Sequence, residues 1–415
     1  MLADRLRAVA FARPPSSTRD AATTVSLVVL CQVLHSLTFV GVALFLPLIR
    51  EDLGITFAQA GMLSAAGTLT YGLGQLPAGI LSDRYGPRRL FFIGLIGWSL
   101  LCVNLGLARS FESALAIMLA AGAFRSLLFA PGLSLLASWF PPERRATAMS
   151  LYMVGGFTGT ILLSLAGPAF AARFGWRVAF VTFAILGVAG ALVYLLYARD
   201  KPRRPSAPSP GLTDVLHLAR HRIIWICCAI QFTRFSVVTG LTFWLPSFLV
   251  ADRGFSLETA GLVAAMSAAL TAASNAVGGY VSDRLRNPPL VIGASLAVLA
   301  CVSTVIVFVE ALPLLLIVVA VGSIFLQFYF GPLFFVPIEV LGPRTAGMAT
   351  GLTNLFANTG GLLTAYALGV VKDASGSFTW GFIGIGVMCL IGVALSVVLA
   401  RVRRRALLER ADAIP

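Results

Sequence analysis

Charged residues are scarce in this sequence. Asp, Glu, Lys and Arg make up only 12% of its 415 residues, whereas soluble domains average about 25%. Hydrophobic residues account for 58% of the chain. So few charges cannot cover the water-facing surface of a chain of this length, which excludes an ordinary soluble protein. The hydrocarbon core of a bilayer is the solvent that suits this composition.

Acidic residues are scarcer than basic ones. The chain has 17 Asp and Glu against 31 Lys and Arg, and its net charge is +14. Nucleic-acid binding is one reason for a basic chain, but here the basic residues form short clusters between long apolar runs. We therefore expect no nucleic-acid partner. Basic clusters between apolar runs are typical of the cytoplasmic loops of a membrane protein.

Metal-ligating residues are also few. The six cysteines all fall within apolar runs, where we expect small buried hydrophobic residues and not a disulfide framework. His217 and His221 are four residues apart, but no third ligand is nearby in the sequence. Glycine-rich patches do not follow a strand, so no phosphate-binding loop is indicated. We predict no metal and no cofactor.

Long apolar runs dominate the rest of the chain. A spanning helix needs about 20 mostly apolar residues, and twelve segments qualify. We predict spans at 24–49, 56–81, 90–108, 112–139, 146–171, 178–198, 223–250, 257–281, 289–309, 312–340, 346–371 and 379–400. The fold class is therefore an all-α membrane protein with twelve transmembrane helices.

The spans fall into two sets of six. A polar segment at 199–222, rich in Pro and Arg, separates a first bundle at 23–198 from a second at 223–400. We expect cytoplasmic tails at 1–22 and 401–415. With both termini inside, the outer loops hold only Arg50, Arg109, Arg173, Arg177, Arg253 and Lys372. This imbalance predicts cytoplasmic termini, and we expect a multi-pass monomer in a bacterial-type inner membrane.

The two halves repeat one another. Asp83-Arg84 and Asp283-Arg284 lie 200 residues apart, and Leu46-Pro47 and Leu245-Pro246 lie 199 apart. Six helices repeated in one orientation predict two bundles related by an axis along the membrane normal.

One loop carries a recognisable motif. Gly79 to Arg89 reads GILSDRYGPRR and resembles the signature G-x-x-x-D-R-x-G-R-R of the major facilitator superfamily, from which it departs by Pro87. The resemblance covers nearly the whole chain, and the segment Trp139–Arg145 is similar to the family's loop between helices four and five. It implies substrate transport by alternating access, with substrate bound near the midplane, and no enzymatic activity. The family's usual arginine early in helix four is absent, since Met118 lies about where it would fall.

The resemblance also implies a gate at the cytoplasmic helix ends. The residues that it assigns to this gate are Asp83, Arg84, Arg88, Arg89, Arg144, Asp283 and Arg344. The alternative is that these charges only anchor the helices and set their orientation.

Three basic side chains lie near the midpoints of predicted spans. They are His35, Arg125 and Arg234, and His35 and Arg234 occupy equivalent places in the repeat, 199 residues apart. A charge at the bilayer centre costs at least about 2.5–3.5 kcal/mol, and no Asp or Glu lies at this depth. We infer that the counter-charge is the substrate, a small organic anion bearing a carboxylate, sulfonate or phosphate group. The alternative is that backbone and polar side chains satisfy each arginine.

The role of His35 is open between proton transfer and ligand binding, because imidazole titrates near pH 6.5. This residue is our candidate for carrying a coupling proton in symport, but it could instead donate a hydrogen bond to the substrate or be an ordinary core residue. Exchange of two anions is the close alternative. A proton-driven drug or metabolite exporter would need acidic cavity residues, and an intramembrane enzyme or sensor would need a nucleophile or a ligand set that is not evident. Further candidates for substrate contact are Gln32, Tyr71, Gln231, Gln327, Tyr329, Asn354 and Asn358.

Overall fold

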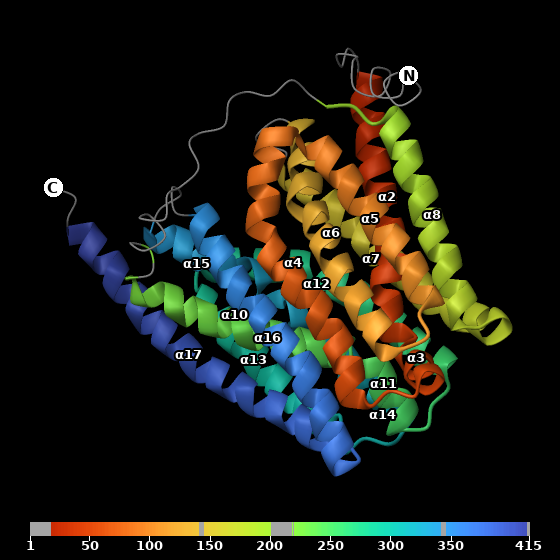
Figure 1. The fold of residues 1–415 in the computed structure, drawn as a ribbon. Helices are drawn as coiled ribbons and strands as arrows, with labels where there is room; N and C mark the ends of the chain where they lie inside the picture. The colour runs from red at the N-terminus through yellow and green to blue at the C-terminus, as the bar shows by residue number, and fades with distance from the viewer. Residues whose placement is uncertain (1–17, 141–144, 201–217, 219, 342–345, 413–415) are drawn as a thin grey trace. The chain divides into compact units, whose positions relative to one another are not determined.

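The computed structural model describes residues 18–140, 145–200, 218, 220–341 and 346–412. These residues form helices joined by short connections, and no strand occurs among them. Figure 1 shows the arrangement. An all-helical chain suits a bilayer because each helix satisfies its own backbone hydrogen bonds where no water is present.

The first half of the chain contains seven labelled helices. They are α2 (Thr18–Leu44), α3 (Leu46–Leu53), α4 (Phe57–Tyr85), α5 (Pro87–Leu107), α6 (Phe111–Ser138), α7 (Arg145–Phe174) and α8 (Trp176–Tyr197). The second half contains α10 (Arg222–Thr242), α11 (Leu245–Ala251), α12 (Leu257–Leu285), α13 (Pro288–Val305), α14 (Leu312–Phe328), α15 (Phe330–Leu341), α16 (Ala346–Ser375) and α17 (Thr379–Asp412).

Twelve membrane crossings follow from these helices. Within the described residues, ten helical stretches are long and apolar enough to span a bilayer, with α14 and α15 counted as one. The other two crossings are α4 and α16, of 29 and 30 residues, which carry more Gly, Ser, Thr and Asn. The predicted twelve-helix fold is therefore confirmed.

Several boundaries differ from the prediction: α2 already begins at Thr18, and the predicted span 312–340 is divided at Tyr329 into α14 and α15. The first and seventh spans are each broken near their ends, so that the short helices α3 and α11 begin at Leu46 and Leu245. Pro47 and Pro246 follow these positions directly, and proline fits the first turn of a new helix because it lacks an N–H. The last helix continues to Asp412, through much of the predicted C-terminal tail, and Arg403 on this extension forms a bidentate ion pair with Glu339.

By contacts, the chain divides into two compact units. The first contains residues 1–53 and 66–207, and the second contains 54–65 and 208–415. The opening turns of α4 group with the second unit because they pack on α16. There the Asp373 carboxylate accepts hydrogen bonds from the backbone N–H groups of Phe57 (3.0 Å) and Ala58 (2.7 Å), where a negative charge is favoured by the helix dipole.

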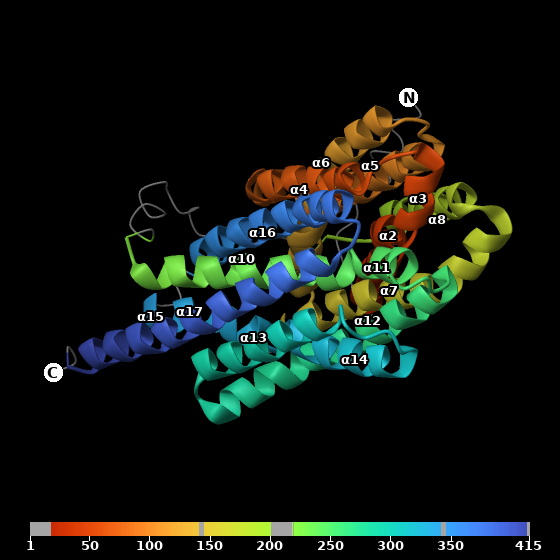
Figure 2. The same cartoon turned by 90° about the horizontal axis from the view of Figure 1, so that it is seen from below.

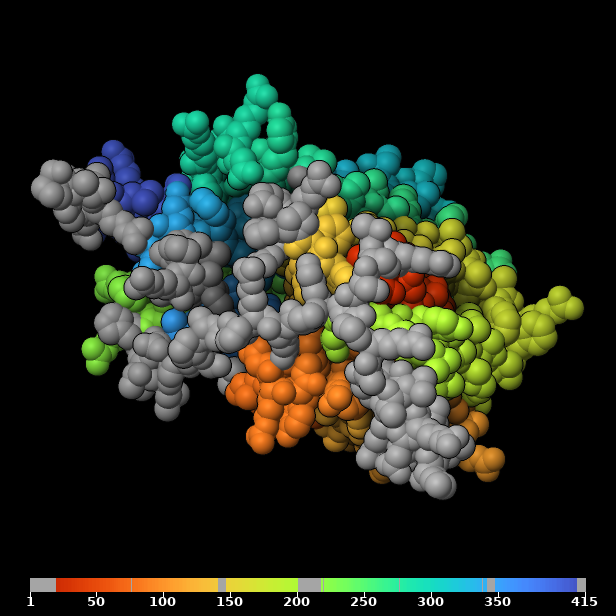
Figure 3. All heavy atoms as spheres, turned by 90° about the horizontal axis from the view of Figure 1, so that it is seen from above, coloured from red at the N-terminus to blue at the C-terminus, as the bar shows by residue number. Residues whose placement is uncertain are grey.

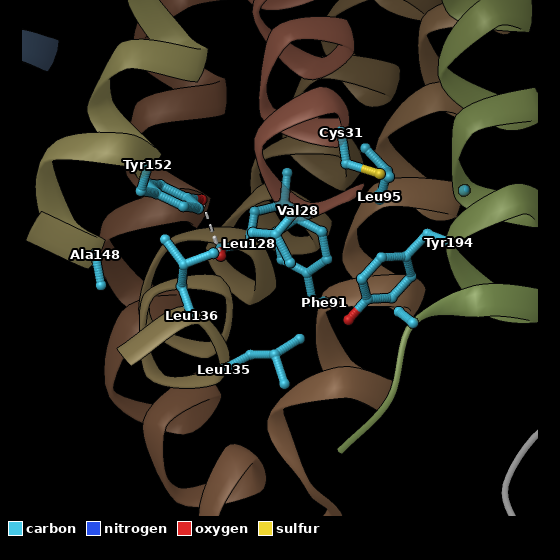
Figure 4. Packing of buried hydrophobic residues seen from close by; sticks show 12 residues of the cluster. Val28, Cys31, Phe91, Leu95, Leu128, Leu135, Leu136, Ala148, Tyr152 and Tyr194 are labelled. Atoms are coloured by element: carbon cyan, nitrogen blue, oxygen red, sulfur yellow. Dashed lines mark hydrogen bonds between the residues drawn. The ribbon is translucent and has the colours of Figure 1, made fainter. Parts of the chain in front are cut away.

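The core of the first unit joins α2, α5, α6, α7 and α8, and Figure 4 shows how its side chains pack. The buried cluster consists of Val28, Cys31, Phe91, Leu95, Leu128, Leu135, Leu136, Ala148, Tyr152, Ala191, Tyr194 and Ala198. Its two phenols are satisfied by backbone carbonyls: Tyr152 donates to Leu128 (3.1 Å) and Tyr194 donates to Arg88 (3.3 Å). Buried hydroxyls in a membrane protein need such partners, and these bonds fix the packing of α7 on α6 and of α8 on α5.

The cysteines are all free thiols, as expected. Five are buried, but Cys301 is exposed, so the expectation that all six are buried is wrong for that residue. An exposed thiol on α13 is compatible with a membrane-spanning helix, because a lipid-facing surface accepts small hydrophobic side chains. Large apolar side chains such as Leu73, Phe308 and Trp380 are likewise more than 60% exposed.

The ends of the first unit are well defined. The start of α2, the connection between α4 and α5, and the end of α8 lie together at one end (Figure 1). Figure 3 looks onto this end, with α4 and α5 in orange and α8 in yellow-green. The backbone N–H of Arg199 donates to the hydroxyl of Thr24 at 3.0 Å, which ties the end of α8 to α2. In the second unit, α10, α16 and α17 lie side by side in both Figure 1 and Figure 2.

Candidate functional site

Arg125 lies in the middle of α6, and two aromatic rings cover it. Its guanidinium carbon is 3.8 Å from the ring centroid of Phe39 on α2 and 4.2 Å from that of Tyr71 on α4. Among the described residues it has neither a hydrogen bond nor an ion pair. The rings stabilise the cation through their π faces, but they leave its N–H donors without an acceptor in the part of the chain that the structure describes.

His35 lies one helical turn before Phe39 on α2. The two rings are nearly parallel, with an interplanar angle of 8° and centroids 5.8 Å apart. Trp98 packs against the imidazole at 5.2 Å, and its indole N–H donates to Thr38 at 2.8 Å. His35 is 6% exposed, and neither ring nitrogen has a hydrogen-bond partner. The imidazole is therefore held by packing against Phe39 and Trp98 and not by hydrogen bonds to its ring nitrogens.

Arg234 on α10 lies in a different environment, within the second unit. Its Nε–H donates to Oε1 of Gln231 at 2.7 Å, and its Nη1–H donates to Oε1 of Gln327 on α14 at 3.2 Å. The Phe330 ring centroid is 5.0 Å from its guanidinium carbon. The structure thus satisfies Arg234 with neutral amides in place of a carboxylate.

Two donors beside Arg234 remain unused. The Nε2 of Gln231 and the hydroxyl of Tyr329 are buried and have no hydrogen-bond partner. Gln231 and Tyr329 are both fully buried. An unpaired buried donor costs about 1–3 kcal/mol, so a ligand oxygen that reached these atoms would remove that cost.

The remaining predicted contact residues are less closely connected. Gln32 lies one turn before His35, and its Oε1 is buried without a partner. Asn358 donates to the backbone carbonyl of Asn354 within α16 at 2.9 Å. No hydrogen bond joins either asparagine to Arg234, so the structure brings Gln231 and Gln327 to that arginine but not Asn354 or Asn358.

The predicted gate residues lie at helix ends. Asp83 and Arg84 are exposed in the last turn of α4, and Asp283 is exposed in the last turn of α12. Arg88 is 3% exposed and donates from Nη2 to the carbonyl of Leu195 on α8 at 2.7 Å, so it has a structural bond within its own unit. Arg89 is exposed beside it, whereas Arg144 and Arg344 lie outside the described residues.

The sequence did not single out Phe39, although its ring centroid lies nearer to the guanidinium carbon of Arg125 than that of Tyr71 does. The available signal was its spacing, because Phe39 follows His35 by four residues and therefore lies on the same helix face. The sequence also did not single out Phe330, which lies near Arg234, or Trp98, which packs against His35. Among the described residues no group of three or more His, Cys, Asp or Glu could hold a metal ion.

Twelve spanning helices in two sets of six, each set with an arginine near the middle of a span, define a polytopic α-helical membrane protein built as a duplicated bundle. The family model for the Major Facilitator Superfamily matches residues 28–365, with a second match at 250–413. The chain therefore belongs to the major facilitator superfamily.

Several proteins resemble the chain over most of its length. It is 24% identical to the hexuronate transporter of Bacillus subtilis (strain 168), over 93% of this chain and 94% of that protein. It is also 24% identical to the probable galactarate/D-glucarate transporter of the same organism, over 88% and 89%. A bacterial homologue of the human lysosomal transporter Spinster, solved inward-facing and unoccupied, has the same fold, with a TM-score of 0.81 at 20% identity over 94% of this chain and 99% of that chain.

The two arginines are expected to differ in what they contribute to stability. Arg125→Met removes a cation that no protein group bonds, so the free energy of unfolding should stay within about 1 kcal/mol of wild type or rise, as at sites where function costs stability. Gln231→Leu removes the partner of the Arg234 Nε–H and should lower the free energy of unfolding by about 1–3 kcal/mol.

Thermal unfolding of the purified variants in detergent, without added anion, measures this difference. A loss of stability in Arg125→Met as large as that in Gln231→Leu would show that Arg125 is a structural residue.

Proposed function

We propose that this protein is a secondary active transporter that moves a small organic anion across the membrane by alternating access. The single observation that carries the proposal is Arg125, a cation in the middle of a span whose N–H donors have no acceptor among the described residues. Membership of the superfamily supports transport as the activity. Relatives named for hexuronate and for galactarate or glucarate support an organic carboxylate as the substrate.

The physical reason is the cost of an unpaired charge. The effective penalty for removing an ion from water is several kcal/mol even after relaxation. A carboxylate on the edge of Arg125 would offset this penalty with two charge-assisted hydrogen bonds. The empty site is then a poor state for the cation, and binding of an anion is favoured over binding of a neutral or cationic solute.

The second arginine adds to this selectivity. Arg234 keeps its charge while its neutral partners Gln231 and Gln327 bear no negative charge to cancel it. The unused donors on Gln231 and Tyr329 suit oxygen acceptors such as carboxylate or hydroxyl groups. We propose that this cluster also contacts an oxygen-rich anion, which sugar acids provide.

Proton coupling is proposed through His35. Its two nitrogens have no hydrogen-bond partner, and it is stacked on the Phe39 ring that also covers Arg125. A proton on the imidazole and an anion at Arg125 would therefore be bound close together, and the anion would favour the protonated form. Exchange of one anion for another is the alternative, because it would not require His35 to change charge.

The orientation is also a proposal. The distribution of Lys and Arg supports cytoplasmic termini, and the bacterial relatives support an inner membrane as the location. We further propose that the protein acts as a monomer. At the cytoplasmic helix ends, Asp83 and Asp283, with the arginines near them, would then form a gate.

If Arg125 and Arg234 bind the substrate, replacing either with lysine should impair transport even though the positive charge is kept. Arg125→Lys and Arg234→Lys should each reduce uptake of D-glucuronate into proteoliposomes by about tenfold or more, because lysine lacks the planar fork of donors. Arg109→Lys, at an exposed arginine beyond α5, serves as the control and should retain wild-type uptake. Transport of cations that is unaffected by the first two substitutions would overturn the proposal.

The coupling assignment predicts a change in driving force. In wild-type proteoliposomes an outside-acid pH gradient should accelerate anion uptake several-fold, as general proton linkage requires. His35→Gln should abolish this acceleration while anion-for-anion exchange continues, since the arginines are intact. A wild-type protein that ignores the gradient but exchanges anions would establish the antiport alternative.

The gate assignment predicts a defect in transport without a defect in folding. Asp83→Asn should slow uptake by about tenfold because it removes the carboxylate charge that would pair with a basic group in the gate, while keeping the shape of the side chain. Its unfolding temperature should match that of Glu112→Gln, a control in the first turn of α6. Wild-type transport rates in Asp83→Asn would remove the residue from the gate.

A further inference from the structure

Two rings enclose the guanidinium of Arg125 on different sides. Phe39 and Tyr71 place their centroids 3.8 and 4.2 Å from the same carbon atom, yet no ring contact joins them to each other. Two rings this close to one atom avoid contact only if they lie in widely separated directions. They therefore cover opposite faces of the guanidinium plane, and we call this arrangement the Phe39–Tyr71 slot.

The slot leaves only the edge of the guanidinium open. The N–H donors lie in the plane of the group, and none of them is bonded to a described residue. Arg125 itself is half-buried, and Phe39 is still 39% exposed. A ligand can therefore reach the edge of the fork, but not its faces.

We propose that the Phe39–Tyr71 slot makes Arg125 selective for a carboxylate over a sulfonate or phosphate group. In a carboxylate, both oxygens, the carbon and the first carbon of the substituent are coplanar, so the group can lie flat between the layers that the rings define. When two oxygens of a tetrahedral anion occupy that plane, the third oxygen and the substituent point out of it toward the two rings. The inference rests on the proposed function and narrows its substrate class.

Arg234 cannot supply the same selectivity. Its Nε–H is bonded to Gln231, which occupies the edge that includes Nε, and one Nη1–H is bonded to Gln327, so a bidentate anion would have to compete with at least one amide or use the Nη1–Nη2 edge. Of Arg125 and Arg234, only Arg125 has a fork with no hydrogen bond to any described residue. Phe39 and Tyr71 are thus positioning residues, which act through Arg125.

The test compares matched ligands on purified full-length protein in detergent. The probes are D-glucuronate and glucose that carries a sulfonate on C6, with D-galactarate as a second carboxylate. Wild type should bind D-glucuronate about tenfold or more tightly than the sulfonate, a difference that corresponds to one lost charge-assisted bond. Phe39→Leu and Tyr71→Leu should reduce this ratio below about threefold, whereas Tyr71→Phe and Phe39→Tyr keep the rings and should keep the ratio.

The ratio of the two affinities distinguishes a positioning role from a structural one. A loss of folding would weaken the binding of carboxylate and sulfonate equally and leave the ratio unchanged. Equal binding of carboxylate and sulfonate by wild type, or an unchanged ratio in Phe39→Leu and Tyr71→Leu, would overturn the slot while leaving anion transport intact. Failure of wild type to bind any of the three anions would overturn the proposed function itself.

Discussion

A guanidinium inside a bilayer needs a negative partner, and neither Arg125 nor Arg234 has one among the described residues. A protein that evolved only for stability would replace such residues with apolar ones, because an uncompensated charge is costly at this depth. Their presence in both halves of a duplicated fold is best explained by a ligand that brings the missing charge. Electrostatics therefore favours a negatively charged substrate, and membership of the superfamily indicates transport by alternating access.

The two halves stabilise their arginines in different ways. The first unit uses aromatic faces, which hold Arg125 without occupying its N–H donors. The second unit uses amide oxygens, which hold Arg234 by two of its donors and leave amide and phenol groups unused nearby. The first arrangement suits a bidentate contact with one anionic group, and the second suits several weaker contacts with an oxygen-rich molecule. The two cations do not occupy equivalent places in the repeat, because the position that corresponds to Arg234 is His35.

Composition and hydropathy predict most of the fold, because a spanning helix is a long and strongly constrained signal. The breaks at Leu46 and Leu245 were not predicted, since a proline near the end of an apolar run is equally compatible with a continuous helix. The extension of α17 was also missed, because its arginines resemble a disordered basic tail until Glu339 is seen to pair with Arg403. The sequence predicts that no Asp or Glu lies at the depth of Arg125 and Arg234, and among the described residues neither arginine forms an ion pair. Their actual surroundings were not predictable, because Phe39 is one of 29 phenylalanines and nothing local distinguishes it from a lipid-facing one.

The most direct test of the central claim observes the guanidinium itself. In protein labelled with ¹⁵N-arginine, the side-chain resonance that disappears in Arg125→Met identifies Arg125 in an NMR spectrum. Addition of D-glucuronate should shift this resonance, and addition of uncharged glucose at the same concentration should leave it in place. A resonance that responds to neither solute, while the anion is still transported, would contradict the claim that the substrate neutralises Arg125.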